Sequence, residues 1–302
     1  MVDLHFDLPM FLYDNRDRKN VLASDFLPEF EAGDIGTAAA GIYIEDQYIP
    51  DKALEVALAQ VARIYVEVER CDRFTICRSY AEIKNAREQG KIGLLITMEG
   101  AEPIGTDLNL LYIFYELGLR VIGLTHARSN ATGSGGVFAP TGSSPKGLTA
   151  FGCELVRECE RVGVILDLAH INPAGFDDIL ENTTRPVIVS HTNARKYYDI
   201  ERNISDEQIK MVGARGGVIS VHAAKVFKPD PRVYRLLEAR CGVTPDKVCF
   251  LSSNCWDAHG AAHFGFATVW VNRAGAPDDN LPGETVATVK DLSQLPSLLG
   301  VS

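Results

Sequence analysis

The sequence predicts an α/β fold of the (β/α)8 type, a TIM-like barrel, for most of its 302 residues. Strand and helix patterns alternate along the chain, which implies a parallel sheet with right-handed crossovers. A single α/β barrel of this length is ordinary. Side chains that could bind metal fall where apolar strands stop, and in a parallel barrel such strand ends form the rim on which active sites are built.

Short apolar runs rich in β-branched residues are typical of buried strands. The first two-thirds of the chain contains seven of them, at residues 2–7, 36–44, 92–99, 119–126, 163–170, 186–191 and 217–221. Helical periodicity appears between them, at residues 51–71, 108–117, 149–161 and 205–214, and Ser205 is placed to cap the last helix. Residues 129–148 are rich in Ser, Gly, Thr and Pro, which predicts a long loop on the same rim.

The amino-acid composition predicts a globular protein without a nucleic-acid or membrane partner. With 46% hydrophobic and 23% charged residues, the chain has the make-up of an ordinary globular protein. A net charge of -10 without a basic stripe argues against a nucleic-acid partner. No apolar run approaches the ~20 residues of a membrane span, and a strand at the N-terminus leaves no room for a signal peptide. Seven cysteines without CxxC pairs indicate free thiols, so we expect a cytoplasmic protein without a membrane partner.

Five potential metal ligands lie at the carboxyl ends of these strands: His5, Asp7, Glu99, His170 and His191. A lone histidine in such a place is more often a hydrogen-bonded rim residue, and a lone carboxylate often caps the next helix. The shared position of all five favours a metal site. Imidazole and carboxylate are ligands of Zn²⁺, and two ions that share a carboxylate can drive hydrolysis. We therefore predict a binuclear metal hydrolase.

Several motifs make residues 2–219 similar to the membrane (renal) dipeptidase family of amidohydrolase-like barrels. They are His5-Phe6-Asp7-Leu8-Pro9, Met98-Glu99-Gly100, Leu124-Thr125-His126 with Asn130, Asp167-Leu168-Ala169-His170, Val189-Ser190-His191 and Glu201-Arg202-Asn203, and they follow the family's order.

The resemblance implies two zinc ions and a dipeptide substrate. His5 and Asp7 would bind one ion, His170 and His191 the other, and Glu99 would bridge them and take part in catalysis. His126 would be catalytic and substrate-binding, near the substrate carbonyl, and Arg202 would hold the free carboxylate of the substrate. A planar guanidinium suits bidentate carboxylate binding. A homodimer is left open.

The end of the chain resembles a different family. Residues 226–234, 250–257 and 265–273 look like the C-terminal part of an L-2-haloacid dehalogenase of the haloacid dehalogenase superfamily. This resemblance predicts a chimera of a barrel portion, residues 1–219, and a Rossmann-like segment, residues 220–302, that completes the same domain. Two further strands, 248–253 and 267–272, would give nine in total, with 248–253 filling the last barrel position.

A junction between residues 219 and 220 would affect the expected hydrolysis of dipeptides. The dipeptidase family places an Asp at the end of its last barrel strand, where this chain offers Ser253 or Asn254 instead. We therefore expect weakened or lost dipeptide hydrolysis, with a non-catalytic engineered chimeric scaffold as the alternative. Dehalogenase activity is a weaker alternative, because residues 1–30 contain no Asp-x-x-Gly-Thr nucleophile motif and an ester intermediate could not form.

Overall fold

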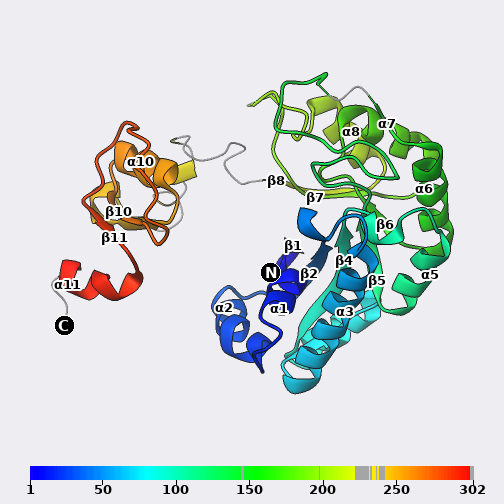
Figure 1. Ribbon diagram of the computed structural model, residues 1–302, viewed down its shortest axis with the longest axis horizontal. Coiled ribbons are helices and arrows are strands. Elements are labelled where there is room, and N and C mark those ends of the chain that lie inside the picture. The colour runs from blue at the N-terminus through cyan, green and yellow to red at the C-terminus, as the bar shows by residue number, and fades with distance from the viewer. Residues whose placement is uncertain are drawn as a thin grey trace. The chain divides into compact units, whose positions relative to one another are not determined.

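The computed structural model describes residues 1–143, 146–196, 198–221, 231, 233–235, 237 and 242–299, and of Val221 and Leu299 it describes the backbone. The chain divides into two compact units, Met1–Val221 and His222–Ser302 (Figure 1). Among the described residues, no helix has both the length and the apolar character needed to cross a membrane.

The first unit is built on an eight-stranded sheet in the order β1-β2-β4-β5-β6-β7-β8, with β3 paired to β4. The strands are β1 (Val2–Phe6), β2 (Thr37–Tyr43), β3 (Phe74–Ile76), β4 (Ile92–Glu99), β5 (Leu119–Gly123), β6 (Ile165–Asp167), β7 (Ile188–Thr192) and β8 (Val218–Val221). Every pairing is parallel. The sheet curls into a nearly closed barrel, so that the ring of His5 in β1 stacks on that of His191 in β7 with centroids 4.1 Å apart.

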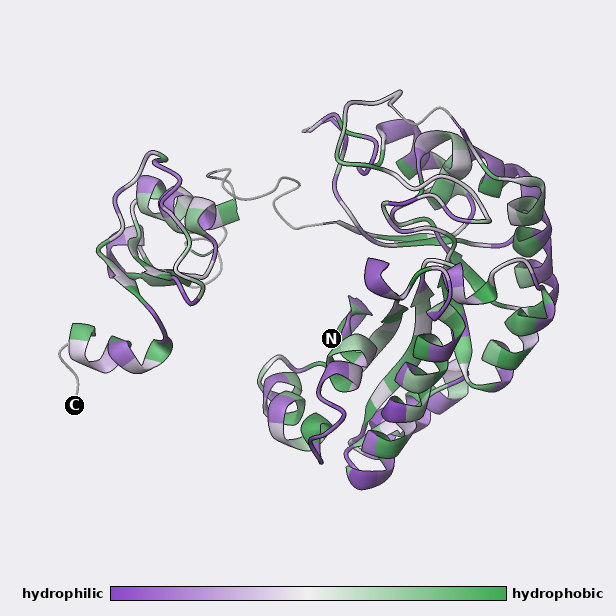
Figure 2. Cartoon of the chain, viewed as in Figure 1, coloured by the Kyte–Doolittle hydropathy of each residue, from purple (hydrophilic) through white to green (hydrophobic). Residues whose placement is uncertain are grey.

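Amphipathic helices connect the strands and cover the outer face of the sheet (Figure 1). They are α1 (Leu8–Asp14), α2 (Leu27–Ala32), α3 (Ala53–Arg70), α4 (Tyr80–Glu88), α5 (Asn109–Glu116), α6 (Ala150–Val162), α7 (Pro173–Asn182) and α8 (Asp206–Ala214), with short turns at Leu22–Phe26, Asp46–Tyr48 and Glu102–Ile104. Green and purple bands alternate along these helices in Figure 2, as expected when one face is buried. One continuous hydrophobic core lies between the helices and the sheet.

The expected strands of this unit are present in the predicted order. The expected cap is also present: Ser205 and Gln208 form a capping box at the start of α8. Strand β3 was not expected, because three residues are too few to show a period. The strand predicted at 163–170 is wrong in length, since β6 ends at Asp167 and His170 has a left-handed backbone with φ of +62°.

The second unit has a three-stranded parallel sheet of its own, in the order β11-β10-β9. Its elements are β9 (Cys249–Ser252), α10 (Cys255–Phe264), β10 (Ala267–Val271), β11 (Ala287–Val289) and α11 (Leu295–Leu299), with short turns at Pro245–Lys247 and Leu292–Gln294. Aromatic rings from Tyr234, Phe250, Phe264 and Phe266 pack against one another in its core.

The expectation that residues 248–253 fill the last barrel position is wrong in the described sheets. β9 pairs with β10 of its own unit, and the barrel sheet runs from β1 to β8 without it. A nine-stranded barrel is therefore not formed. The physical reason is proximity along the chain: β9, α10 and β10 form a compact β–α–β unit whose closure entropy is small.

The buried face of α5 allows a matched test of the barrel core. Leu111 is fully buried, whereas Ile113 on the same helix is 52% exposed. We expect Leu111→Ala to lower the free energy of unfolding by about 2–5 kcal/mol, because it leaves a cavity. Ile113→Ala should change it by about 0.5 kcal/mol or less. Far-ultraviolet circular dichroism in denaturant measures both, and equal effects would contradict the assigned core.

Candidate metal centre

Glu99 lies at the end of β4, and three histidine side chains converge on it. The distances from Glu99 Oε1 to Nε2 are 3.1 Å for His170, 3.5 Å for His191 and 3.6 Å for His5. The Nε2 atoms of His170 and His191 are 2.8 Å apart. The barrel thus brings β1, β4 and β7 and the turn after β6 to one point, as the strand-end pattern predicts.

His5 and Asp7 approach this cluster from β1. The distance between His5 Nε2 and Asp7 Oδ1 is 3.3 Å, and the Asp7 side chain is 61% exposed. Gly41 in the neighbouring strand gives the His5 ring its space, because a Cβ atom there would lie 3.1 Å from the ring. Burial lowers the pKa of His5, but the hydrogen bond with Asp7 and the charge of Glu99 outweigh it and leave that pKa raised.

His126 and Arg202 border the same cluster. The rings of His126 and His170 have centroids 4.2 Å apart, and burial lowers the pKa of His126. Arg202 is buried and donates from its guanidinium to the His191 carbonyl at 2.9 Å. Burial lowers the Arg202 pKa to about 10, so the side chain still carries its positive charge at neutral pH.

The donor atoms fit a cation. Burial lowers the pKa of both His170 and His191 from the ordinary 6.5, so their rings are neutral at pH 7. Burial also raises the pKa of Glu99. Neutral imidazole nitrogens that face each other and a carboxylate are the environment that Zn²⁺ satisfies. In two groups of residues the potential ligand atoms all lie within 4.8 Å of one another: His5–Glu99–His191 and Glu99–His126–His170.

Asp7 belongs to neither of these two groups. His126, expected only as a substrate and catalytic residue, lies within one of them. The division of ligands between two ions therefore stays a prediction, although the residues that sequence analysis selected do lie together.

Sequence reasoning assigned no role to two supporting residues, Asp167 and Ser190. Asp167 Oδ1 accepts from the backbone N–H groups of Ala169 and Ser190, both at 3.0 Å, and so fixes the turn before His170 to β7. Ser190 Oγ lies 2.8 Å from His191 Nδ1 and orients that ring. The signal for both residues was their place in a family motif, Asp167-Leu168-Ala169-His170 for one and Val189-Ser190-His191 for the other.

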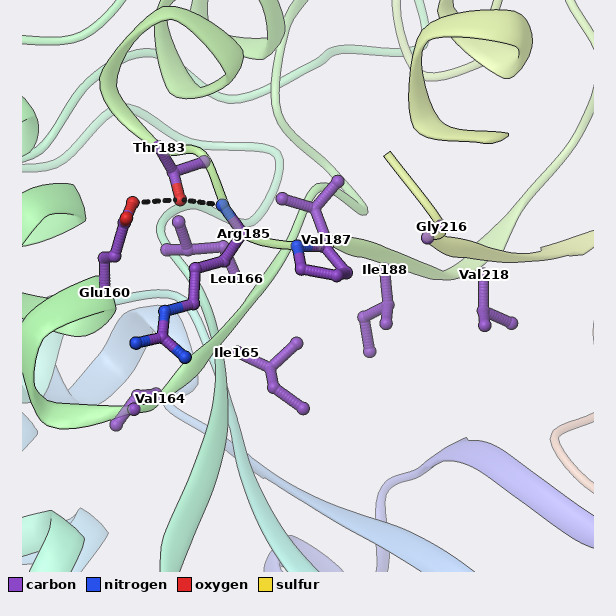
Figure 3. A pocket seen from close by; sticks show the side chains of 13 residues that line it. Glu160, Val164, Ile165, Leu166, Thr183, Arg185, Val187, Ile188, Gly216 and Val218 are labelled. Carbon is purple, nitrogen blue, oxygen red and sulfur yellow. Dashed lines mark hydrogen bonds between the residues drawn. The ribbon is translucent and has the colours of Figure 1, made fainter. Parts of the chain in front are cut away.

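The barrel also contains an apolar cavity of about 320 Å³ at the amino ends of β6, β7 and β8. Figure 3 shows Ile165, Ile188 and Val218 projecting from these neighbouring strands along it. Ile165 is 41% and Val218 52% exposed. Since the histidines lie at the opposite strand ends, this cavity is separate from the metal centre.

Comparisons with known proteins identify the family of this chain. A family model for membrane dipeptidase, peptidase family M19, matches residues 1–294. An uncharacterised dipeptidase of Schizosaccharomyces pombe is 29% identical over 253 residues, 76% of this chain and 61% of its own length. A dipeptidase of Clonostachys rogersoniana is 28% identical over 73% of this chain and 61% of its own length. The chain thus spans about three-fifths of these curated relatives.

Solved structures give the same fold. Dipeptidase AC, a metallopeptidase of family M19, has a TM-score of 0.70 and 28% identity, covering 80% of this chain and 81% of its own. A metallopeptidase from Rhodobacter sphaeroides, liganded with a phosphinate mimic of the dipeptide L-Ala-D-Ala, has a TM-score of 0.69 and 27% identity, covering 80% and 82%.

The expected chimera receives no support from these comparisons. The family model continues to residue 294 and so includes the segment that resembles a haloacid dehalogenase. A solved dehalogenase matches with a TM-score of only 0.26, a value too low to assign a fold. Within the described part of that segment, Asp257 is buried and accepts from the hydroxyls of Tyr234 and Ser252.

The depressed pKa of His170 predicts a pH effect on the metal-free chain. The unfolded state takes up a proton near pH 6.5 and the folded state does not, so His170 makes the fold less stable as pH falls below 6.5. We expect His170→Asn, a residue that tolerates positive φ, to shrink the loss of unfolding free energy between pH 7.5 and 5.5 by about 1 kcal/mol. Denaturant titrations with chelator present measure it; an unchanged pH dependence would contradict the assignment.

Proposed function

Because this chain belongs to the membrane dipeptidase family, peptidase family M19, we propose that it is a zinc-dependent hydrolase of dipeptides. The observation that carries the proposal is the convergence of three histidine Nε2 atoms on Glu99 Oε1, within 3.1, 3.5 and 3.6 Å. A largely buried carboxylate surrounded by imidazole nitrogens is the donor set of a hydrolytic zinc site.

The proposed site holds two zinc ions. His5 and Asp7 would bind one, His170 and His191 the other, and Glu99 both. Bound zinc supplies Lewis acidity toward a carbonyl oxygen and lowers the pKa of water, which is what peptide hydrolysis at neutral pH requires. Ser190 and Asp167 would hold the histidines in place through the hydrogen bonds that they make to His191 and to the backbone.

Two cationic or polar groups would orient the substrate. Arg202 keeps its charge while buried, and it would bind the free carboxylate of a dipeptide. His126, adjacent to His170, would donate to the carbonyl oxygen of the scissile bond. The dipeptide mimic bound to the Rhodobacter sphaeroides relative supports a substrate of this size.

We further propose that hydrolysis is slow. In the family pattern a strand after β8 supplies an Asp that moves a proton, and the described strands of the first unit end with β8. Asp7 is half exposed and already hydrogen bonded to His5, so it is a poor substitute. We expect kcat below roughly 1 s⁻¹, the low end of the usual enzyme range. A kcat well above this value would refute the proposal that hydrolysis is slow, but not the proposal that the chain hydrolyses dipeptides.

Removal of the central carboxylate tests the reaction. We expect Glu99→Gln to lose the barrel zinc and at least roughly a hundredfold in kcat/KM for dipeptides, because an amide lacks the charge that two cations require. Glu116→Gln, an exposed change on α5, is the matched control. Zinc content by mass spectrometry and ninhydrin assay of released amino acids measure both. Turnover that survives Glu99→Gln and chelation would refute the proposal.

The role of Arg202 predicts a substrate-dependent effect. We expect Arg202→Lys to lower kcat/KM for dipeptides by roughly tenfold to a hundredfold, mostly through KM, since an ammonium cannot bind a carboxylate in two places. A dipeptide amide, which lacks that carboxylate, should show little difference between the two proteins. Arg157→Lys on the exposed face of α6 is the control. Equal losses on acid and amide would show that Arg202 acts on structure alone.

A further inference from the structure

The C-terminal unit contains a second cluster of metal-binding side chains: Cys255, His259 and Asp278. Their ligand atoms all lie within 4.8 Å of one another. Cys255 and His259 are four residues apart on α10, and that spacing places both on one helix face. Asp278 comes from the loop after β10. A sulfur, a nitrogen and an oxygen donor therefore meet from two separate segments of the chain.

The hydrogen bond that His259 makes to Gly283 leaves its second ring nitrogen facing a carboxylate. Nδ1 lies 2.5 Å from the carbonyl oxygen of Gly283, and a carbonyl only accepts, so Nδ1 carries the hydrogen. Nε2 lies 3.0 Å from Asp278 Oδ1. In the neutral ring Nε2 carries a lone pair and no hydrogen. A lone pair that faces a carboxylate oxygen requires a proton or a cation between the two atoms.

Backbone groups support the other two ligands. Cys255 is buried, and its Sγ accepts from the N–H of Asp279 at 3.4 Å. Asp278 Oδ1 also accepts from the N–H of Asn280 at 2.8 Å. An imidazole that donates one ring N–H to a carbonyl while its second nitrogen faces the other ligand atoms is the arrangement found around protein-bound zinc.

A glycine holds the loop against the helix. Gly283 has φ of +102°, and a Cβ atom there would lie 2.2 Å from the His259 carbonyl oxygen and 2.5 Å from the His263 nitrogen. Any side chain would push the loop away from α10. The close approach fixes the Gly283 carbonyl on His259 and keeps residues 276–283 over the cluster.

We propose that Cys255, His259 and Asp278 bind one divalent transition-metal ion of the zinc type, in a site separate from the barrel. Tetrahedral zinc at its usual bond lengths separates its ligands by about 3.3–3.8 Å, which small side-chain rotations can reach here. Thiolate and imidazole donors exclude Ca²⁺ and Mg²⁺. Since the Asp278 side chain is 52% exposed, water completes the fourth position.

This site has a spectroscopic signature that the barrel lacks. None of the proposed barrel ligands contains sulfur, so of the two proposed sites the C-terminal one alone can give a thiolate-to-cobalt charge-transfer band in the near ultraviolet. We expect Co²⁺ titration of the reduced full-length chain to produce this band with a stoichiometry of one ion per chain. Glu99→Gln should lower the total cobalt bound and leave the band unchanged, which separates this inference from the dipeptidase proposal.

Matched variants assign the ligands. Cys255→Ser should abolish the band, whereas Cys249→Ser, which changes an exposed thiol, should leave it intact. His259→Gln should weaken cobalt binding at least tenfold, whereas His263→Gln, at an exposed position on the same helix, should not. Gly283→Ala should also weaken binding, although it removes no ligand, because the loop can no longer approach α10.

A measurement on the unmodified chain avoids dependence on variant folding. X-ray absorption at the zinc edge of the zinc-loaded protein should show a sulfur neighbour at about 2.3 Å. The absence of both the cobalt band and this sulfur shell would overturn the proposal and leave His259 and Asp278 as an ion pair only. A band that persists in Cys255→Ser would overturn it as well.

Discussion

The Glu99 carboxylate, largely buried at the end of β4 with its side chain 12% exposed, is the constraint on which the carboxyl end of the barrel depends. A buried carboxylate without positive neighbours costs several kcal/mol. Here the nearest groups are the Nε2 atoms of three histidines, at 3.1, 3.5 and 3.6 Å. Two of those rings are kept neutral by burial, so the histidines do not fully compensate the charge. The cluster therefore favours any arrangement that brings a cation to Glu99.

The surrounding structure serves to hold the histidines at that point. Asp167 joins the turn before His170 to the backbone of β7, and Ser190 orients the ring of His191. Gly41 makes room for His5. These contacts come from neighbouring strands, so the precision of the site is a property of the parallel sheet and not of any single loop.

Strand period and strand-end chemistry were enough to predict the nearly closed barrel and the cluster of candidate metal ligands at its rim, because both follow from local patterns of apolar and polar residues. The left-handed turn at His170 could not be read this way, since it arises from the hydrogen bonds of Asp167 across two strands. The short β3 offers no period at all. The place of β9 was mispredicted because a resemblance between sequences does not say which strand edge a segment will pair with. Asp278 and Gly283 carry no motif, and only their approach to α10 brings them to Cys255 and His259.

The position of β1 at an edge of the barrel sheet has a kinetic consequence for metal exchange. Among the described strands β1 pairs only with β2, so its backbone hydrogen bonds lie on one side and its local opening is easier than that of an interior strand. That strand carries His5 and leads directly into Asp7. His170, by contrast, lies in the turn directly after β6 and His191 lies in β7, and both of these strands have neighbours on both sides. If each pair holds one ion, the two ions should leave at different rates, with the first lost by fraying of an edge strand and the second only after a larger opening of the barrel.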